Sequence, residues 1–203
     1  MSTPQTLRSA KGVLAAVVCG LSMTSCADVA RTGTGPAYLI MQSVSGARGG
    51  ATTGTFASNL ESDVVTNNSV FSDVGQASIR AEMKNSLSTT APTPLHSITL
   101  NRYRVHYVRT DGQNQPGIDV PFDIEGGTTV TIQVGTGTPQ NVGFDLVRLQ
   151  AKLERPLRNL VGGGGLIVIS TIAEVTFYGS DQAGNEVSIT GRIDVKFADF
   201  GDS

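Results

Sequence analysis

Residues 165–200 decide the fold of this chain, and they read GLIVISTIAEVTFYGSDQAGNEVSITGRIDVKFADF. Apolar or small residues occupy alternate positions in two runs, which is the period of a β-strand with one buried and one solvent-facing side. The first run comprises Ile167, Ile169, Thr171, Ala173, Val175 and Phe177, and the second comprises Val187, Ile189, Gly191, Ile193, Val195 and Phe197. Turn-forming residues separate the two runs at 180–185. The stretch therefore predicts a long β-hairpin that forms the central pair of a sheet.

The composition is typical of an all-β domain and limits the partners of the chain. The 203 residues include 24 glycines and no tryptophan, and Gly, Thr, Val and Ser dominate. Charged residues make up 16%, with a formal net charge of −2. This balance is too neutral to predict nucleic acid or an anionic membrane surface as the main partner. No apolar stretch approaches the roughly 20 residues needed to span a bilayer.

The N-terminus has the three features of an export signal. Arg8 and Lys11 make the first residues basic, residues 13–23 form an apolar run, and small residues follow at 24–27. The apolar run is only about eleven residues long, which is typical of a signal peptide and too short for a permanent transmembrane helix. We expect residues 1–25 to be an export signal peptide.

The segment Met23-Thr24-Ser25-Cys26 resembles the lipobox of bacterial lipoproteins, although Met23 stands where that family usually has Leu. The resemblance implies that Cys26 is acylated through its sulfur and becomes the new N-terminus. Residues 26–35 would then be a lipidated tether, and the chain would be anchored in the bacterial cell envelope, at the outer membrane. Cys19, the only other cysteine, would leave with the signal, so the mature chain would have no disulfide. Ordinary cleavage near Cys26 without a lipid is the alternative.

Residues 36–203 are predicted to form one domain of strands and turns. Before the hairpin, strand candidates lie at 36–44, 60–65, 78–84, 98–109, 118–124 and 130–134, separated by loops at 45–58 and 135–143 and turns at 111–117 and 126–127. Pro121 favours an edge position for the strand at 118–124. The leucines in 144–160 fit helical spacing as well as strand spacing. Pro156 and the neighbouring strands favour a strand to about Leu153, followed by a loop through Gly165.

The hairpin turn carries a second resemblance. Asp181-Gln182-Ala183-Gly184-Asn185 is similar to the D-x-A-G-N turn of bacterial immunoglobulin-like domains, and it lies between two long strands as in that family. The resemblance implies an immunoglobulin-like β-sandwich. Together with the strand pattern, we expect an all-β sandwich of about eight or nine antiparallel strands. Such a fold by itself indicates no activity.

The residue types required for catalysis and for metal or cofactor binding do not form a known motif. His96 and His106 are the only histidines, no Gly-x-Ser-x-Gly sequence occurs, and no cysteine follows Cys26. Oxygen ligands for a cation occur in two groups, at Asp119, Asp123 and Glu125 and at Asp181, Asn185 and Asp194. Neither group forms a calcium-binding loop, so solvated carboxylates at strand ends are the simpler interpretation. The glycines at 162–165 lack the Lys-Ser/Thr of a phosphate loop. We therefore expect a non-enzymatic protein without a metal or cofactor.

Two surface features could bind a partner. Arg102, Arg104, His106 and Arg109 follow one another along 98–109, interleaved with Tyr103 and Tyr107. Alternation places the tyrosines on the opposite face, so a charged outer face over an aromatic inner face is the simpler interpretation, and a binding platform is the alternative. The predicted edge at 119–124 could accept a partner strand, although Pro121 would protect it from pairing.

Three functional hypotheses follow from the sequence. The first is a lipid-anchored envelope protein with a non-catalytic binding or structural role, attached to the membrane through Cys26 and contacting an unknown envelope protein or glycan. The second is a secreted or envelope ligand-binding module for a glycan or a metal, which would use loops such as 45–58. The third is a cryptic enzyme of the envelope.

Overall fold

The computed structural model describes residues 35–50, 55–85 and 91–201 of the chain. These residues belong to a unit that begins at Gly35. The predicted signal peptide, Cys26 and the predicted tether before Gly35 lie outside the described residues. Among the described residues, no helix has the length and apolar character that would be needed to cross a membrane.

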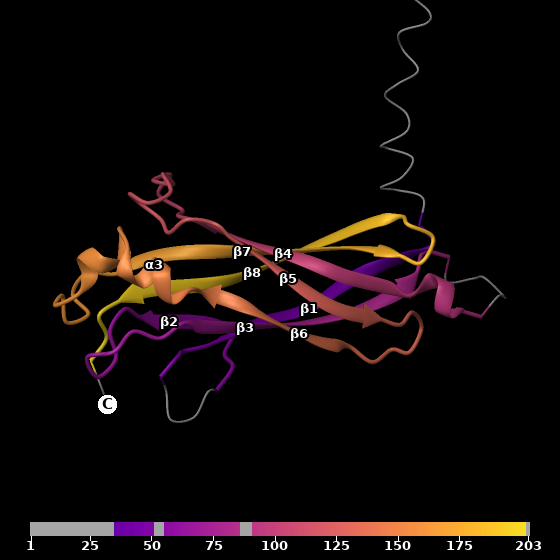
Figure 1. Ribbon diagram of the computed structural model, residues 1–203, viewed down its shortest axis with the longest axis horizontal. Coiled ribbons are helices and arrows are strands. Elements are labelled where there is room, and N and C mark those ends of the chain that lie inside the picture. The colour runs from indigo at the N-terminus through magenta and orange to yellow at the C-terminus, as the bar shows by residue number, and fades with distance from the viewer. Residues whose placement is uncertain (1–34, 51–54, 86–90, 202–203) are drawn as a thin grey trace, which may run out of the picture. The chain divides into compact units, whose positions relative to one another are not determined.

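The described unit consists of two β-sheets with very little helix, which confirms the prediction of an all-β fold (Figure 1). One sheet has the strand order β1-β3-β6, with β1 at Ala37–Ala47, β3 at Asp73–Met83 and β6 at Gln140–Val147. The other has the order β2-β8-β7-β4-β5. Its strands are β2 (Asn59–Asp63), β4 (Ile98–Val108), β5 (Ile124–Ile132), β7 (Ile169–Asp181) and β8 (Glu186–Ala198). The short helical elements are η1 (Pro94–His96), α3 (Leu149–Leu153) and η2 (Leu157–Leu160).

The predicted hairpin is confirmed as β7 and β8, both inside the five-stranded sheet. The two strands pair antiparallel from Ile169–Phe197 to Ser180–Glu186 without a register shift. The Asp181 side chain holds the turn, because its Oδ1 accepts hydrogen bonds from the backbone N–H of Ala183 (3.0 Å) and of Asn185 (2.8 Å). Gly184 adopts φ +84°, a left-handed conformation that glycine adopts without strain. The apolar run predicted from Ile167 is shorter in the structure, since Ile167 precedes β7 and is 58% exposed.

The core lies between the two sheets, and aromatic side chains from both sheets meet there. Phe144 of β6 packs edge-on against Phe177 of β7, with ring centroids 5.5 Å apart. The hydroxyl of Tyr107 on β4 donates a hydrogen bond to the backbone oxygen of Leu146 on β6 (2.5 Å). Tyr107 and Phe177 are fully buried, and each such side chain contributes roughly 1.5–3 kcal/mol relative to an exposed one. The predicted inner face of β4 is therefore confirmed.

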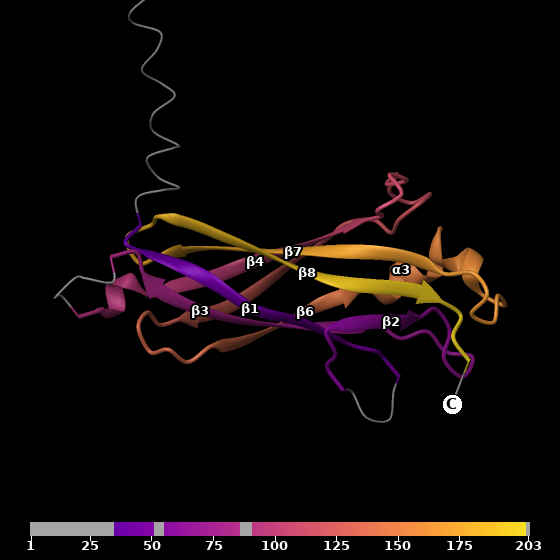
Figure 2. The same ribbon diagram turned by 180° about the vertical axis from the view of Figure 1, so that it is seen from behind.

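One strand pair is parallel, which corrects the expectation that all strands pair antiparallel. β2 runs parallel to the last five residues of β8, from Asn59–Asp194 to Asp63–Ala198. The reason is topological. The chain leaves β1 in one sheet, where β1 pairs with β3, and the next strand joins the opposite sheet beside β8 (Figure 2).

The predicted turn at Gly126–Gly127 is wrong, as is the predicted edge strand at 118–124. Both glycines lie inside β5, where Gly126 is opposite Tyr103 and Gly127 is opposite Arg102 on β4. A Cβ atom on Gly126 would approach the Tyr103 ring to 2.4 Å, so the glycine makes room for the aromatic side chain. Residues 118–123 form no strand, and Ile118 and Phe122 are more than half exposed. A partner strand and a packed ring have thus outweighed the local turn signal.

The predicted strand through Leu153 is also wrong. β6 ends at Val147, α3 follows at Leu149–Leu153, and η2 follows at Leu157–Leu160. The helical leucine spacing divides between the two short elements, since Leu157 and Leu160 are buried while Leu149 and Leu153 are over 40% exposed. Pro156, reached through a cis peptide bond, separates the two elements.

The strand ends of β1, β3 and β6 differ from the prediction as well. β1 continues to Ala47, so the predicted loop at 45–58 begins later, and Gly46 forms a bridge with Ala57. β3 begins at Asp73 and not near residue 78, and β6 begins at Gln140, inside the loop predicted for 135–143. In each case a neighbouring strand extends the ladder into a polar or glycine-containing stretch.

Candidate functional site

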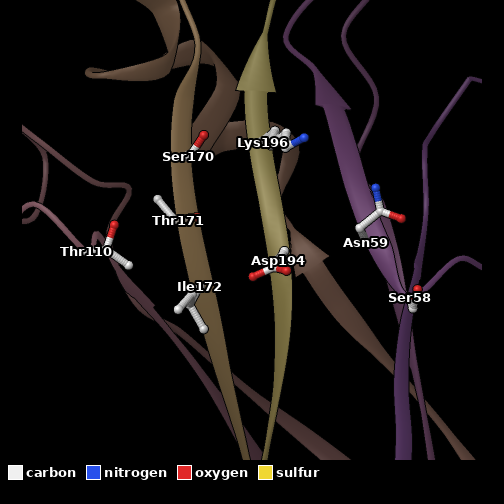
Figure 3. A pocket seen from close by; sticks show the side chains of 8 residues that line it. All are labelled: Ser58, Asn59, Thr110, Ser170, Thr171, Ile172, Asp194 and Lys196. Carbon is white, nitrogen blue, oxygen red and sulfur yellow. The ribbon is translucent and has the colours of Figure 1, made fainter.

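The outer face of the five-stranded sheet carries a polar groove of about 440 Å³ near the parallel β2–β8 pair. Figure 3 shows Asp194 and Lys196 on β8, between Ser170 and Ile172 of β7 and Asn59 of β2. The register explains this grouping, because Asp194 is opposite both Ile172 and Asn59. The lining residues are Ser58, Asn59, Thr110, Ser170, Thr171, Ile172, Asp194 and Lys196.

The groove offers hydrogen-bonding groups of several kinds in a small space. The wall of the groove includes groups that can each donate and accept hydrogen bonds, namely the hydroxyl groups of Ser58, Thr110 and Ser170 and the amide of Asn59. Asp194 only accepts hydrogen bonds, and Lys196 only donates them. Its volume lies in the range of small-molecule sites. This arrangement suits a polar ligand rich in hydroxyl groups and of low net charge. Of the residues that line the groove, the sequence analysis singled out Asp194, and only as a possible cation ligand.

The rest of this outer face carries the predicted row of basic residues, and in the structure each arginine of this row contacts a different partner. Arg102 lies over the Tyr178 ring, with its guanidinium carbon 4.4 Å from the ring centroid. Arg104 forms an ion pair with Asp123 (2.5 Å), and Arg109 forms one with Asp111. Because carboxylates offset most of this charge, the row does not form the continuous basic platform that was considered as an alternative.

His106 belongs to the same set of contacts. Its Nδ1 lies 2.7 Å from Oδ1 of Asp123, whose Oδ2 accepts from Arg104. Partial burial would raise the pKa of Asp123, but the hydrogen bonds from Arg104 and His106 outweigh it and hold this pKa below its usual value. Among the described residues, no serine or threonine hydroxyl is hydrogen-bonded to His106. The cluster therefore acts as an ion-pair clamp between β4 and the segment before β5. His96 lies elsewhere, in η1, where its Nδ1 accepts a hydrogen bond from the Thr93 N–H (3.1 Å).

A buried ion pair lies at the α3 end of the domain, and sequence reasoning missed it. The Nζ of Lys152 is 2.9 Å from Asp73 at the start of β3, and both side chains are at most 1% exposed. Asp73 also accepts hydrogen bonds from the Ser62 hydroxyl (2.6 Å) and from the Gly49 N–H (2.8 Å). Burial lowers the pKa of Lys152, and the attraction of Asp73 opposes this shift. The network ties α3 to three segments that are distant in sequence.

A second carboxylate extends this network. Asp63, at the end of β2, is 2% exposed and lies 2.5 Å from the guanidinium of Arg48. It also accepts hydrogen bonds from the Thr66 hydroxyl (2.6 Å) and from the Phe200 N–H (2.9 Å). Two acids thus balance two bases within the protein. These contacts indicate that the network fastens the loops and the C-terminal segment together.

An apolar surface lies beside this network. Leu166, Ile167 and Val168 are 92%, 58% and 43% exposed, and they follow four consecutive glycines and precede β7. A cleft of about 450 Å³ is lined by Val65, Val70, Lys152, Leu153, Arg158 and Val161. Val161 and Leu153 are about half exposed. Sequence reasoning placed Leu166 and Val168 in or beside a strand and gave no signal for this exposure.

The six residues considered as cation ligands do not converge on one site, although Nδ2 of Asn185 donates a hydrogen bond to Asp181 (2.7 Å). Asp123 serves the His106–Arg104 contacts, Asp181 holds the hairpin turn, and Asp119 accepts from the Gln115 N–H (3.0 Å). Glu125 lies on β5 opposite Arg104, and Asp194 lines the groove. Within the part of the chain that the structure describes, no group of three His, Cys, Asp or Glu residues is placed to hold a metal ion.

Comparison of the chain with protein-family models, with curated proteins and with solved structures found no match. The functional proposals below therefore depend on the sequence and on the geometry described above.

Proposed function

We propose that this chain is a lipid-anchored protein of the bacterial cell envelope with a non-catalytic binding role. Cys26, at the end of a signal-like segment, would carry the lipid, and the β domain would begin shortly after it at Gly35. Acyl chains contribute about 0.8 kcal/mol of membrane affinity per buried CH₂. The domain itself would then contact another component of the envelope.

The observation that carries the binding role is the exposed apolar segment Leu166–Val168. Soluble proteins rarely expose three successive large aliphatic side chains to water, and exposed apolar patches commonly mark interaction sites. The segment directly precedes β7, whereas Gly35 lies beside Asp181 at the other end of this strand. The 13 residues of β7 span about 43 Å at 3.3 Å per residue. A partner bound to Leu166–Val168 would therefore contact the end of the domain farthest from Gly35.

The anchor is tested by fatty-acid labelling and detergent-phase partitioning in a bacterial host. We expect the wild-type chain to be labelled and to enter the detergent phase. Cys26→Ala should abolish both, while the matched variant Cys19→Ala should change neither. An unlabelled, soluble wild-type chain would refute the anchor, and the binding role would then belong to a secreted protein.

The apolar segment is tested separately by site-specific photo-crosslinking in cells. A photoreactive residue at Leu166 should capture a discrete envelope protein. The same residue at Asp111, which is exposed in the turn after β4, provides the control. Equal labelling from both positions would refute a binding role for the segment. Leu166→Ser should leave the melting temperature nearly unchanged, because the side chain is 92% exposed.

A glycan ligand is the second candidate function, and the polar groove at Asp194 favours it. Hydroxyl-rich ligands match the mixed donors and acceptors of this groove. Envelope oligosaccharides should then raise the melting temperature of the wild type by preferential binding to the folded state. Asn59→Ala combined with Asp194→Ala should lose that shift, while Glu61→Ala on the same sheet, outside the groove, should keep it.

We also propose that the fold is a distant variant of the immunoglobulin-like sandwich. The order β1-β3-β6 corresponds to strands A-B-E of that fold, and β8-β7-β4-β5 corresponds to G-F-C-C′. The D-x-A-G-N turn joins the strands that would be F and G. An experimental structure with a different strand order would refute this assignment.

A further inference from the structure

Half of the edge of β8 has no hydrogen-bonded neighbouring strand in the described part of the chain, although Met41 and Val44 of β1 pack over Gly191. β7 pairs with β8 along nearly its whole length on one side, but β2 covers the other side only from Asp194 to Ala198. The stretch from Glu186 to Arg192 is therefore an open sheet edge. Such an edge presents unpaired backbone N–H and C=O groups, which readily pair with another strand.

The hydrogen-bonding pattern shows which residues face the open side. The N–H of Asp181 donates to the oxygen of Asn185, so residues 181 and 185 face each other across the hairpin. Facing and non-facing positions alternate along an antiparallel strand, which directs the backbone groups of residues 187, 189 and 191 toward β7. The backbone N–H and C=O groups that point outward are those of Glu186, Ser188, Thr190 and Arg192. The same parity holds farther along β8, where the oxygen of Ala198 accepts from Val64 just beyond β2.

This edge lacks bulges and prolines, two of the features that usually protect edge strands, although it carries the charged residues Glu186 and Arg192. The pairings of β1, β5 and β6 with their neighbours each contain a register shift. The pairing of β8 with β7 is regular over twelve residue pairs, and residues 186–192 contain no proline. Bulges and prolines normally prevent strand addition, and the open stretch of β8 has neither.

The side chains on this edge are complementary to themselves. In an antiparallel pair of two copies centred on Ile189, Glu186 lies opposite Arg192 of the second copy, and Ser188 lies opposite Thr190. Because the arrangement is two-fold symmetric, it contains two Glu–Arg pairs. On the other face, Ile189 meets Ile189, and Val187 meets Gly191, above which Val44 and Met41 of β1 already pack. The register also places outward-facing backbone groups opposite each other, as an antiparallel ladder requires.

We propose that a second copy of this chain adds to the open edge of β8, joining the two five-stranded sheets into one continuous sheet. Roughly eight backbone hydrogen bonds would form across the two-fold axis. Arg192 is paired with Glu174 at 2.8 Å, yet its side chain is 71% exposed, so further guanidinium N–H groups remain for Glu186 of the second copy. Val187 and Ile189, half-buried in one copy, would become buried between the two copies.

A charge exchange tests this dimer. The chain carrying Cys26→Ala, which lacks the proposed lipid, is examined by sedimentation velocity over a range of concentrations. We expect a monomer–dimer equilibrium. Glu186→Arg or Arg192→Glu alone should weaken it roughly 10- to 30-fold, because each creates two like-charge pairs, and the double exchange should restore it to within about threefold. Glu61→Arg, the same charge change on β2, should have no effect. A monomer at all concentrations up to about 1 mM, or a dimer insensitive to the exchange, would overturn the proposal.

Crosslinking tests the register without depending on ion-pair strength. In a chain with Cys19→Ala and Cys26→Ala, Ile189→Cys should form a disulfide-linked dimer on mild oxidation, because its Cα lies about 4.5 Å from its counterpart. Val187→Cys faces Gly191 of the second copy, so it should not crosslink. Ser188→Pro should abolish the dimer and leave the β7 pairing intact, since its N–H points to the open side. Crosslinking of Val187→Cys at the rate of Ile189→Cys would contradict the register.

Discussion

Removing the amino group of Lys152 should destabilise the domain strongly, although no sequence motif marks this residue. Lys152→Met keeps a side chain of similar length but leaves Asp73 as a buried carboxylate without its cation. Breaking a buried ion pair from one side typically costs about 3–5 kcal/mol. The Ser62 hydroxyl and the Gly49 N–H still donate to Asp73, so we expect about 3 kcal/mol, the lower end of that range.

Urea unfolding followed by circular dichroism measures this loss, because the free energy of unfolding falls linearly with urea concentration. Lys152→Met combined with Asp73→Asn removes both charges, and it should be less than about 2 kcal/mol below the wild type. The partly exposed pair Arg80–Glu82, 3.0 Å apart with side chains 33% and 30% exposed, provides the control, and Arg80→Met should cost less than about 1 kcal/mol. A loss below 1 kcal/mol for Lys152→Met, equal to that of the control, would refute the assignment of Lys152 as a buried, paired cation.

Three further outcomes are expected. Gly179→Ala should cost about 1–3 kcal/mol, because a Cβ there would lie 2.2 Å from a backbone oxygen of β4, whereas Gly143→Ala meets nothing within 4 Å and should be tolerated in a comparison of melting temperatures. Burial would raise the pKa of Asp181, but hydrogen bonds to its carboxylate lower this pKa below 3.8. The stability that the carboxylate contributes is therefore present above pH 3.8 and is lost as the pH falls through the lowered pKa. Urea midpoints at pH 3 and pH 6 should differ less in Asp181→Asn than in the wild type. Tyr107→Phe should lose about 1–2 kcal/mol in urea unfolding, because the buried oxygen of Leu146 loses its donor, and an unchanged midpoint would contradict that hydrogen bond.

The functional proposals separate according to where their support lies. The lipid anchor depends on the sequence around Cys26, outside the described residues. The apolar segment at Leu166, the groove at Asp194 and the edge of β8 depend on the structure. Failure of the anchor would therefore leave the other three proposals intact, and each has its own variant and control.

Where the prediction of the fold failed, a longer-range contact had outweighed a local signal. Gly126 and Gly127 indicated a turn, but β4 offered a partner strand and Tyr103 required the space above Gly126. The segment after Val147 satisfied both strand and helix spacing, and local sequence could not decide between them. α3 forms where it brings Lys152 onto Asp73, a contact between residues 79 positions apart.

The sequence by itself determined the all-β class, the β7–β8 hairpin and its turn, and the inner and outer faces of β4. These features depend on alternation and on turn chemistry, which act between residues close together in the chain. Only the tertiary structure decided the parallel pairing of β2, the burial of Lys152 with Asp73, the groove around Asp194 and the open edge beside Glu186. Each of these arises from contacts between segments distant in sequence, and the free energy of those contacts depends on which strands become neighbours, which no local pattern encodes.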